Sequence, residues 1–542
     1  MHVSEAVGRA LASLGVRQAF GVVGSGNFDV TNALIAGGAR YVAARHEGGA
    51  ATMADAYARM SGQVAVLTVH QGCGLTNAMT GIAEAAKSRT PLLVLAAEAN
   101  APTSNFAIDQ AALAVAVGAE PARITSAEIA VAEAARSFQL ARDERRTVVL
   151  NLPLEVQAAT APGSGVLPTF ARPAQGEPSA HDVSALADLL AGARRPVLIA
   201  GRGARHAGDE ILALADACGA LVATSAVARG LFNRSPWSLD VSGGFASPLG
   251  AALITDADVI VGFGCALNMW TMRHGRLIGP ATRVAQVDTD ADALGRHRPV
   301  HVGVVGDSAA TAAAVTGALS GRGQAGYRDD VLRARIDREI RWRDVPYDDW
   351  GNDRTIDPRT LTIALDDMLP RERVVAVDSG NFMGYPSAFL SVPDEFGFCF
   401  TQAFQSIGLG LATAIGAALA RPDRLPVAAL GDGGALMAAA ELDTVRRLGL
   451  PMLVIVYNDS AYGAEVHHFA DGQPLDTVTF PATDIAAVGA GYGLSAVTVQ
   501  APADLAVVQD WVDGPRDRAL LVDAKVATPR GSWWLEEAFR GH

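Results

Sequence analysis

The sequence predicts an α/β protein built from three doubly wound parallel sheets. Short runs of Val, Ile, Leu and Ala alternate with longer helical patterns, which is typical of parallel strands covered by helices on both faces. The chain has 542 residues, too many for one ordinary domain and about right for three. Two stretches break the alternation and are interpreted as linkers. Residues 157–180 are rich in Pro, Gly and Ala, and residues 321–357 are charged and aromatic with a helix among them.

These linkers divide the chain into three expected domains of ordinary size, residues 1–160, 180–325 and 355–542. Each contains short apolar runs of the length of buried strands. The clearest expected strands lie at residues 18–23, 64–69, 91–96, 196–201, 258–264, 283–288, 426–430 and 452–457.

The outer two segments resemble each other. Each has a strand, a glycine-rich turn, a helix of about four turns, a proline and a second strand, and the distance from His70 to Pro91 nearly equals that from Gly431 to Pro451. A common βαβ unit explains much of this likeness. A duplication of one domain would explain it as well.

Composition excludes several classes of protein. The net charge of −13 argues against a surface for nucleic acid or anionic membrane, and no apolar run approaches the roughly 20 residues that span a bilayer. The N-terminus has no signal-peptide pattern. The four cysteines are far apart, without a CxxC pair, and we expect them to be buried thiols in a reducing cytoplasm: Cys73, Cys218, Cys265 and Cys399.

A glycine-rich turn at residues 431–434 carries an acid, Asp432, directly after an apolar strand. A second acid, Asp459, ends the next apolar strand. If the two strands are parallel neighbours, both carboxylates lie at one edge of the sheet. A glycine turn at a helix start favours phosphate, and a carboxylate beside it is compatible with phosphate if Mg²⁺ bridges the two. The alternative is a tight turn in which Asp432 caps a helix, and local patterns leave both readings open.

Longer stretches carry a family resemblance. Gly431-Asp432-Gly433, followed at the right spacing by Asn458-Asp459, resembles the thiamine-diphosphate motif that runs from GDG to an Asn-Asn pair. The segments "QSIGLGLATAIGAALARPDR" and "RHEGGAATMADAYARMSG" resemble those of acetolactate synthase and benzoylformate decarboxylase. The likeness covers the whole chain and implies a pyrimidine-binding, a central and a diphosphate-binding domain in that order.

The resemblance implies a set of cofactor-binding residues. The metal ligands, for Mg²⁺, would be Asp432, Asp459 and the carbonyl of Ala461, with Asp459 in place of the family's usual Asn and Asn458 the less favoured ligand. Ile407 would bend the cofactor beneath its two rings. The other residues implied to bind thiamine diphosphate are Gly380, Asn381, Gln405, Gly431, Gly433, Gly434, Tyr462, Gly463 and Ala464.

The resemblance also implies catalytic residues. Thiamine diphosphate would react through a C2 carbanion and an enamine, and Glu47 would activate it at N1′. Ser25, His70 and Glu465 match positions near the substrate in related decarboxylases, although His70 also suits a core histidine and Glu465 a solvated carboxylate. At most one of the adjacent pair, His467 and His468, can face a pocket if this segment is helical.

The implied function is that of a 2-oxo acid decarboxylase or carboligase, which would pass its product to a proton or to an aldehyde or ketone. Acetolactate synthase is the nearest alternative, but Ala107 and His468 replace residues typical of that enzyme, and "GCALNMWTMRHGR" argues against FAD. A non-catalytic paralogue has no need for Glu47 and the two acids, and a Rossmann oxidoreductase needs a ribose-binding acid that is not evident. The resemblance implies a homodimer or a dimer of dimers.

Overall fold

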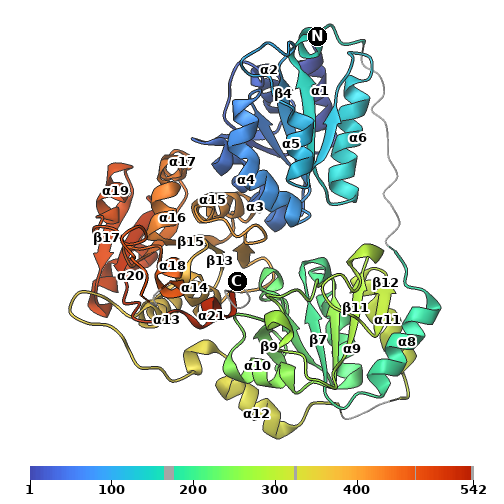
Figure 1. The fold of residues 1–542 in the computed structure, drawn as a ribbon, viewed down its shortest axis with the longest axis vertical. Helices are drawn as coiled ribbons and strands as arrows, with labels where there is room; N and C mark the ends of the chain where they lie inside the picture. Colours follow the sequence, from blue (N-terminus) through green and yellow to red (C-terminus); the bar gives the residue numbers. More distant parts are fainter. Residues whose placement is uncertain (164–175, 323–325, 470–471, 539–542) are drawn as a thin grey trace.

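Three six-stranded parallel sheets, each with helices on its faces, make up the molecule (Figure 1). The computed structural model describes residues 1–163, 176–322, 326–469 and 472–538. The fold class expected from the sequence is therefore confirmed, and the expected apolar runs all form strands. Among the described helices, none is long and apolar enough to cross a membrane.

The N-terminal sheet has the strand order β2-β1-β3-β4-β6-β5. Its strands are short, and those between the two edges are buried on both faces, as parallel sheets require. Its strands are β1 Gln18–Gly21, β2 Arg40–Ala43, β3 Ala65–Val69, β4 Leu92–Glu98, β5 Glu120–Arg123 and β6 Thr147–Pro153, and its helices are α1 Val3–Ser13, α2 Phe28–Ala36, α3 Glu47–Ser61, α4 Cys73–Lys87, α5 Gln110–Ala116, α6 Ala130–Asp143 and α7 Leu154–Ala158.

The central sheet has the order β12-β11-β10-β7-β8-β9, which is the strand order of a dinucleotide-binding fold. Its strands are β7 Pro196–Ala200, β8 Leu221–Thr224, β9 Ser238–Val241, β10 Val259–Phe263, β11 Arg283–Asp288 and β12 Val302–Val305. Its helices are α8 Ala180–Ala191, α9 Gly208–Cys218, α10 Pro248–Thr255 and α11 Ser308–Leu319, and α12 Asp330–Glu339 lies in the connection that follows.

The C-terminal sheet has the order β14-β13-β15-β16-β18-β17, which repeats the order of the N-terminal sheet strand for strand. The likeness of the outer segments thus extends to their whole topology. The strands are β13 Arg373–Val377, β14 Phe398–Phe400, β15 Leu425–Gly431, β16 Leu453–Asn458, β17 Ser495–Val499 and β18 Leu520–Lys525, and the helices are α13 Pro358–Met368, α14 Gly384–Phe389, α15 Gly410–Ala420, α16 Asp432–Met437, α17 Leu442–Leu448, α18 Gly463–His468, α19 Ile485–Gly491, α20 Ala506–Asp513 and α21 Trp533–Ala538.

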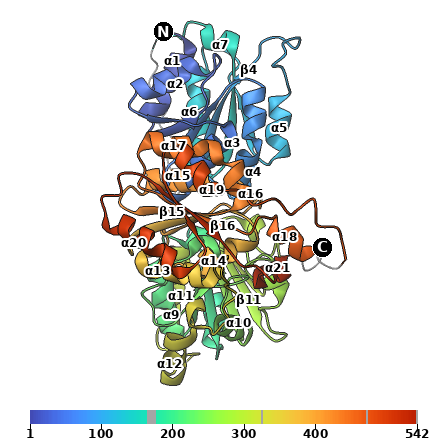
Figure 2. The same ribbon diagram turned by 90° about the vertical axis from the view of Figure 1, so that its left-hand side faces the viewer.

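One hydrophobic core joins the N-terminal and C-terminal sheets through helices α3 and α15, which lie side by side in both ribbon views (Figures 1 and 2). The helices approach so closely that a Cβ on Gly416 would lie 2.2 Å from the carbonyl oxygen of Met53. The central sheet has cores of its own. The two sheets expected to share a cofactor therefore form one packed body.

Two buried glutamates fix this junction in a reciprocal way. Glu84 of α4 accepts hydrogen bonds from the backbone N–H groups of Ala403 and Phe404, at 3.0 and 2.6 Å. Glu441 accepts from the N–H groups of Arg45 and His46, both at 3.0 Å. Each glutamate lies in the helical segment after its own glycine turn and holds the loop that precedes α15 or α3 of the other sheet.

Two sequence-based expectations need correction. The helix of about four turns after Gly431 is interrupted, because a tighter 3₁₀ turn at Ala439–Glu441 separates α16 from α17. That turn is where Glu441 bonds to the other sheet. Cys218, Cys265 and Cys399 are buried free thiols, but Cys73 is exposed because it begins α4 at the open edge of the N-terminal sheet.

Candidate active site

Two carboxylates meet at the carboxyl edge of the C-terminal sheet. Strands β15 and β16 pair in parallel with Gly431 opposite Tyr457, so Asp432 and Asp459 leave neighbouring strands at the same edge. Burial is the main reason that the pKa of Asp432 rises to about 6 and that of Asp459 to about 7. The charge of Asp432 raises the pKa of Asp459 further. Two carboxylates so placed are poorly compensated by protein groups and suit a cation.

Residues on either side of Asp459 in the sequence pack around its carboxylate at the carboxyl edge of the C-terminal sheet. A Cβ on Gly463 would lie 2.4 Å from Asp459 Oδ2, so a larger residue there would have to displace the carboxylate. The N–H of Ala461 stabilises both carboxylates in their charged form. Asn458 has another role, because its Nδ2 donates to Asp523 at 2.8 Å and its Oδ1 accepts from Ser460. Asn458 is therefore engaged within the fold, and the role of Asp459 as a ligand stays a prediction.

Glycines and an unpartnered amide lie beside the acids. The turn after β13 brings Gly380 and Asn381 next to the turn at Gly431, since Phe382 packs close to both Gly380 and Gly431. Asn381 is buried, and its Oδ1 accepts from Ser532 Oγ at 2.7 Å. Its Nδ2 has no hydrogen-bond partner in the described part of the chain. The remaining expected residues adjoin this point: Gly433 packs on the ring of Tyr462, Gly434 lies beside Asp378, and Ala464 lies on α18.

The loop before α15 carries Gln405 and Ile407, and it holds Gln405 in an unusual conformation. Gln405 has φ +60°, a left-handed conformation that few residues other than glycine adopt. The buried carboxylate of Asp378 fixes the loop by accepting from the N–H of Gly408, with both oxygens at 3.0 Å. Sequence reasoning missed Asp378, although it ends strand β13 as Asp432 ends β15, and the same rule would have found it.

A second group of predicted residues lies on the N-terminal sheet. Glu47 is the first residue of α3, and Asn77 Nδ2 donates to its Oε2 at 3.1 Å. His70 follows β3, and Gly74 of α4 separates the two side chains. A Cβ on Gly74 would lie 3.1 Å from His70 Cβ and 3.6 Å from Glu47 Oε1. The carboxylate of Glu47 and the Cβ of His70 therefore both lie close to Gly74, whereas the imidazole ring of His70 lies beside Gly24.

His70 is oriented by its neighbours. Its Nδ1 lies 3.1 Å from the carbonyl oxygen of Gln71, which can only accept, so Nδ1 carries a hydrogen. Its Nε2 then faces Ser25 Oγ at 3.5 Å, and its ring packs edge-on against Phe106. His70 is half-buried rather than enclosed in the core. A neutral imidazole in this tautomer can accept a proton at Nε2.

Helix α18 carries the remaining predicted residues, Glu465, His467 and His468. Glu465 is partly exposed, and its N–H donates to the carbonyl of Tyr462. His467 packs against Gly531, and burial lowers its pKa. His468 is exposed and contacts the ring of Phe469. The two histidines point to different surroundings, as expected for adjacent residues of a helix.

The two groups do not meet within one chain. Among the described residues, no hydrogen bond joins Glu47, His70 or Ser25 to the acids of the C-terminal sheet. Nor do the described His, Cys, Asp and Glu side chains form a cluster of three that could hold a metal. A cation beside Asp432 and Asp459 would thus need further oxygen ligands from the backbone, water or a bound molecule.

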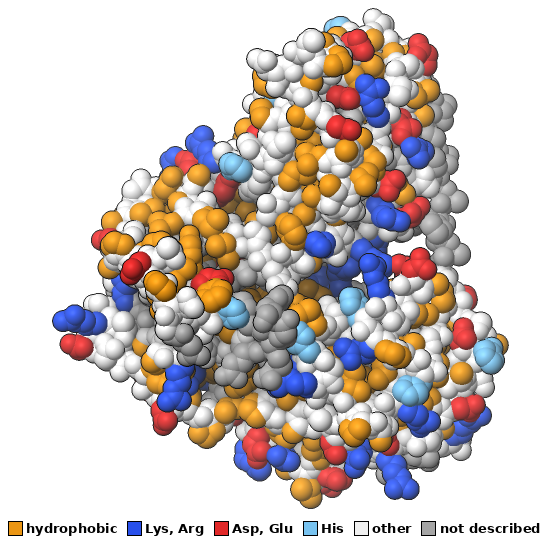
Figure 3. All heavy atoms as spheres, viewed as in Figure 1, with side chains coloured by type: hydrophobic (Ala, Val, Ile, Leu, Met, Phe, Trp, Pro, Cys, Tyr) orange, Lys and Arg blue, Asp and Glu red, His pale blue; other side chains and the backbone are white. Residues whose placement is uncertain are grey.

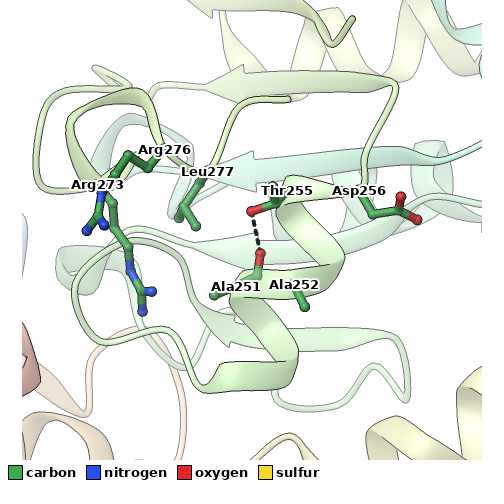
Figure 4. A pocket seen from close by; sticks show the side chains of 7 residues that line it. All are labelled: Ala251, Ala252, Thr255, Asp256, Arg273, Arg276 and Leu277. Atoms are coloured by element: carbon green, nitrogen blue, oxygen red, sulfur yellow. Dashed lines mark hydrogen bonds between the residues drawn. The ribbon is translucent and has the colours of Figure 1, made fainter. Parts of the chain in front are cut away.

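A separate depression of about 510 Å³ lies on the central sheet, between α10 and the turn at Arg273–Gly275 (Figure 4). It is wide open, and Thr255 Oγ1 donates along its own helix to the carbonyl of Ala251 at 2.8 Å. The guanidinium group of Arg273 donates to backbone carbonyls of Gly243 and Ala246. None of the predicted site residues lines this depression.

Comparison with known proteins decides the family. Three family models match the chain in order: the N-terminal TPP binding domain of thiamine pyrophosphate enzymes over residues 1–116, their central domain over 183–315 and their C-terminal TPP binding domain over 378–523. A probable 2-ketoarginine decarboxylase from Pseudomonas aeruginosa is 30% identical over 522 residues, which cover 93% of this chain and 90% of that protein. This chain belongs to the thiamine pyrophosphate enzyme family.

Other members of the thiamine pyrophosphate enzyme family are similar over most of their length. A sulfoacetaldehyde acetyltransferase from Castellaniella defragrans is 29% identical, covering 87% of this chain and 83% of its own. The large subunit of acetolactate synthase isozyme 2 from Escherichia coli K12 is 27% identical, with coverages of 85% and 84%. The thiamine diphosphate-dependent 4-hydroxybenzoylformate decarboxylase of Rhodococcus jostii RHA1 shares the fold, with a TM-score of 0.82, 21% identity, and coverage of 98% of this chain and all of that one.

The residues at the edge of the C-terminal sheet fit the cofactor of a thiamine pyrophosphate enzyme. Among the described residues, the buried N–H₂ group of Asn381 has no partner and could donate to an anion, and glycine turns adjoin it. Asp432 and Asp459 offer hard oxygen ligands, which Mg²⁺ prefers. The sequence did not indicate the role of Glu441, whose bonds to the N–H groups of Arg45 and His46 position the start of α3 and hence Glu47.

Proposed function

We propose that this thiamine pyrophosphate enzyme is a Mg²⁺-dependent 2-oxo acid decarboxylase or carboligase. The single observation that carries the proposal is the pairing of Asp432 and Asp459 at one sheet edge, beside glycine turns and the unpartnered amide of Asn381. Asp432, Asp459 and the carbonyl of Ala461 would hold Mg²⁺. Gly380, Gly431, Gly433 and Gly434 would face the diphosphate.

Bound thiamine diphosphate supplies a nucleophilic carbon that adds to a keto group and accepts the electrons released with CO₂. Glu47 would hold a proton on the aminopyrimidine, and its partial exposure and the hydrogen bond from Asn77 support this role. Gln405 and Ile407 would contact the same ring through the backbone and side chain. The strained φ of Gln405 fits a backbone carbonyl aimed at a ligand.

We assign proton transfer near the substrate to His70 and Glu465. His70 Nε2 faces Ser25 Oγ, and an imidazole in this position would serve as a general acid or base. Glu465 lies one helical turn from Tyr462, on the segment that leaves the metal edge. We assign the donation of the final proton to this pair, with Ser25 and His467 as orienting groups and His468 at the outer rim.

We further propose that two chains form each active site. Large apolar side chains are exposed at the edges that carry the two groups, with Phe28 53% and Met437 62% exposed. Figure 3 shows hydrophobic side chains gathered on the upper part of the molecule, which is the N-terminal domain, and on the part at the left, which is the C-terminal domain. Others at the same edges are Val23, Phe106, Ile108, Phe404, Leu436, Tyr462, Phe469 and Phe480. Joining the N-terminal edge of one chain to the C-terminal edge of another would cover them, which favours a homodimer or a dimer of dimers.

The substrate class follows from chemistry shared by the relatives named above, whose names describe decarboxylation of a keto acid or acyl transfer. We expect a small 2-oxo acid donor, with an aldehyde or ketone acceptor if the enzyme is a carboligase. Three buried free thiols suit a reducing compartment, and we expect the enzyme in the cytoplasm.

The test is a screen of 2-oxo acids for CO₂ release, with and without acceptor aldehydes, in protein stripped with EDTA. We expect activity only after both thiamine diphosphate and Mg²⁺ are restored. Equal activity in stripped protein, or no CO₂ from any 2-oxo acid tried while the cofactor binds, would contradict the proposal.

A further inference from the structure

The segment that follows β18 lies against the edge of the C-terminal sheet that carries Asp432 and Asp459. It keeps to that edge, because the N–H of Val526 donates to the carbonyl of Asn458 at 3.0 Å. Two residues further on, Thr528 Oγ1 donates to Asp459 Oδ2 at 3.5 Å. The function proposed above uses none of the residues of this segment.

Ser532, in the same segment, is bonded to Asn381. The Ser532 backbone N–H donates to Asn381 Oδ1 at 3.3 Å, and the Ser532 hydroxyl lies 2.7 Å from Oδ1 and 2.9 Å from the carbonyl oxygen of Asn381. Both residues are buried, with 2% and 3% of their surface exposed. A backbone N–H can only donate, so the atom that it meets must be the amide oxygen. The N–H₂ group of Asn381 is therefore turned away from Ser532.

The Asn381 side chain lies beside the two acids. A Cβ on Gly463 would lie 2.4 Å from Asp459 Oδ2 and 3.3 Å from Asn381 Cβ, so both side chains adjoin the same glycine. Phe382, the next residue, packs against Gly431. Asn381 Nδ2 is buried and has no hydrogen-bond partner among the described residues. A buried donor without an acceptor is costly, and an anion bound at this edge would satisfy it.

The two tryptophans that follow the serine hold it in place. Trp533 begins α21, which lies where the C-terminal and central domains meet (Figure 1). Its Nε1 donates to the carbonyl of Gly244 in the central domain at 3.0 Å, and its ring stacks on that of Trp342 with the centroids 4.0 Å apart. Trp534 is buried and packs so closely on α14 that a Cβ on Gly384 would lie 2.2 Å from its ring.

We propose that Ser532 is a positioning residue for the cofactor, because it orients the Asn381 amide so that Nδ2 donates to the diphosphate of thiamine diphosphate. A donor that is already oriented loses little freedom on binding, and its hydrogen bond to a charged acceptor is strong. Without the serine, the amide could turn its oxygen to the anion, which repels it. The inference rests on the proposed position of the diphosphate beside Asn381, and it gives the central domain a part in cofactor binding.

The test measures the binding of thiamine diphosphate to the cofactor-free full chain by calorimetry in the presence of Mg²⁺. The variants are Ser532→Ala, Asn381→Ala and the double variant. The matched control is Ser387→Ala on α14, since Ser387 is a buried serine whose hydroxyl has no hydrogen-bond partner in the described part of the chain. ³¹P NMR of the bound cofactor is recorded for the wild type, Ser532→Ala and Ser387→Ala at saturation.

We expect Asn381→Ala to weaken binding at least about tenfold and Ser532→Ala at least about fivefold, because each removes or misdirects a donor to a charged group. In the Asn381→Ala background, Ser532→Ala should cost less than about twofold more, since its effect passes through the amide. The ³¹P resonances of the bound diphosphate should shift in Ser532→Ala. Ser387→Ala should change neither the affinity nor the resonances.

Two results would overturn the inference and leave the proposed role of Asn381 standing. One is unchanged affinity in Ser532→Ala while Asn381→Ala weakens binding. The other is an equal loss from Ser532→Ala with and without Asn381, together with unshifted ³¹P resonances, which would assign Ser532 a structural role. Unchanged affinity in Asn381→Ala would remove the role of the amide and the inference together. Because no step depends on CO₂ release, a failure of the proposed activity is a separate result.

Discussion

Replacing Asp459 by Asn removes one of two carboxylates that the cation-free fold accommodates poorly. The pKa of Asp459 rises from an ordinary value of 3.8 to about 7, mainly through burial and then through Asp432. At roughly 1.4 kcal/mol per pH unit, this rise corresponds to about 4 kcal/mol, which is an upper value because the two carboxylates are coupled.

The sign follows from proton binding. Between about pH 4 and pH 7 the folded protein holds a proton that the unfolded chain has lost, so the free energy of unfolding falls as pH rises through this window. Above pH 7 the whole penalty is present. Without metal, Asp459→Asn should therefore be more stable than the wild type by a few kcal/mol at pH 8, and by much less at pH 5. Mg²⁺ with the cofactor should reduce the difference, because it neutralises both acids of the wild type.

Urea unfolding in EDTA at pH 5 and pH 8 measures the difference, with and without Mg²⁺ and thiamine diphosphate. Asp510→Asn, an exposed acid on α20, is the control and should change stability little at either pH. The reasoning would be refuted if Asp459→Asn were no more stable than the wild type at pH 8 in EDTA, or if its advantage were equal at both pH values.

Three further predictions test other parts of the molecule. Glu47→Gln should bind thiamine diphosphate nearly as well as the wild type but exchange its C2 proton at least about a hundredfold more slowly, as NMR after acid quench would show, and an unchanged rate would assign Glu47 another role. His70→Asn and Glu465→Gln should each slow product release by at least about tenfold with less effect on substrate addition, whereas normal turnover in both variants would leave the proton to Ser25 or water. Glu84→Ala should cost about 3–5 kcal/mol in urea unfolding, because it removes one of the two carboxylates paired with Arg59 and leaves the N–H groups of Ala403 and Phe404 without their acceptor, and a loss below about 1 kcal/mol would show that water replaces it.

Local patterns were enough to predict the fold class and the meeting of Asp432 with Asp459. Parallel strands and glycine turns are set by residues close in sequence, and the carboxyl ends of neighbouring strands necessarily share an edge. The structure bears out the pairing of β15 with β16 that this prediction required. The roles of the site residues remain predictions.

Residues that act across the three sheets were not predictable in this way. Glu441 bonds to a loop almost 400 positions earlier, and Arg205 of the central sheet donates to the carbonyl of Arg59 on the N-terminal sheet. Nothing local distinguishes these side chains from solvated charges on a helix or loop. The prediction that Cys73 is buried was wrong for a related reason, since its exposure depends on the open edge at which α4 begins.

The most direct test of the central claim, a site shared by two chains, is to mix two inactive variants. Glu47→Gln and Asp432→Ala, with different purification tags, are expressed together, and the mixed dimers are isolated. In each mixed dimer one of the two sites would pair an intact Glu47 with an intact Asp432. We predict that the mixed dimers regain about half of the wild-type CO₂ release, dependent on thiamine diphosphate and Mg²⁺. Mixed dimers as inactive as either parent would place Glu47 and Asp432 in the same chain's site and contradict the claim.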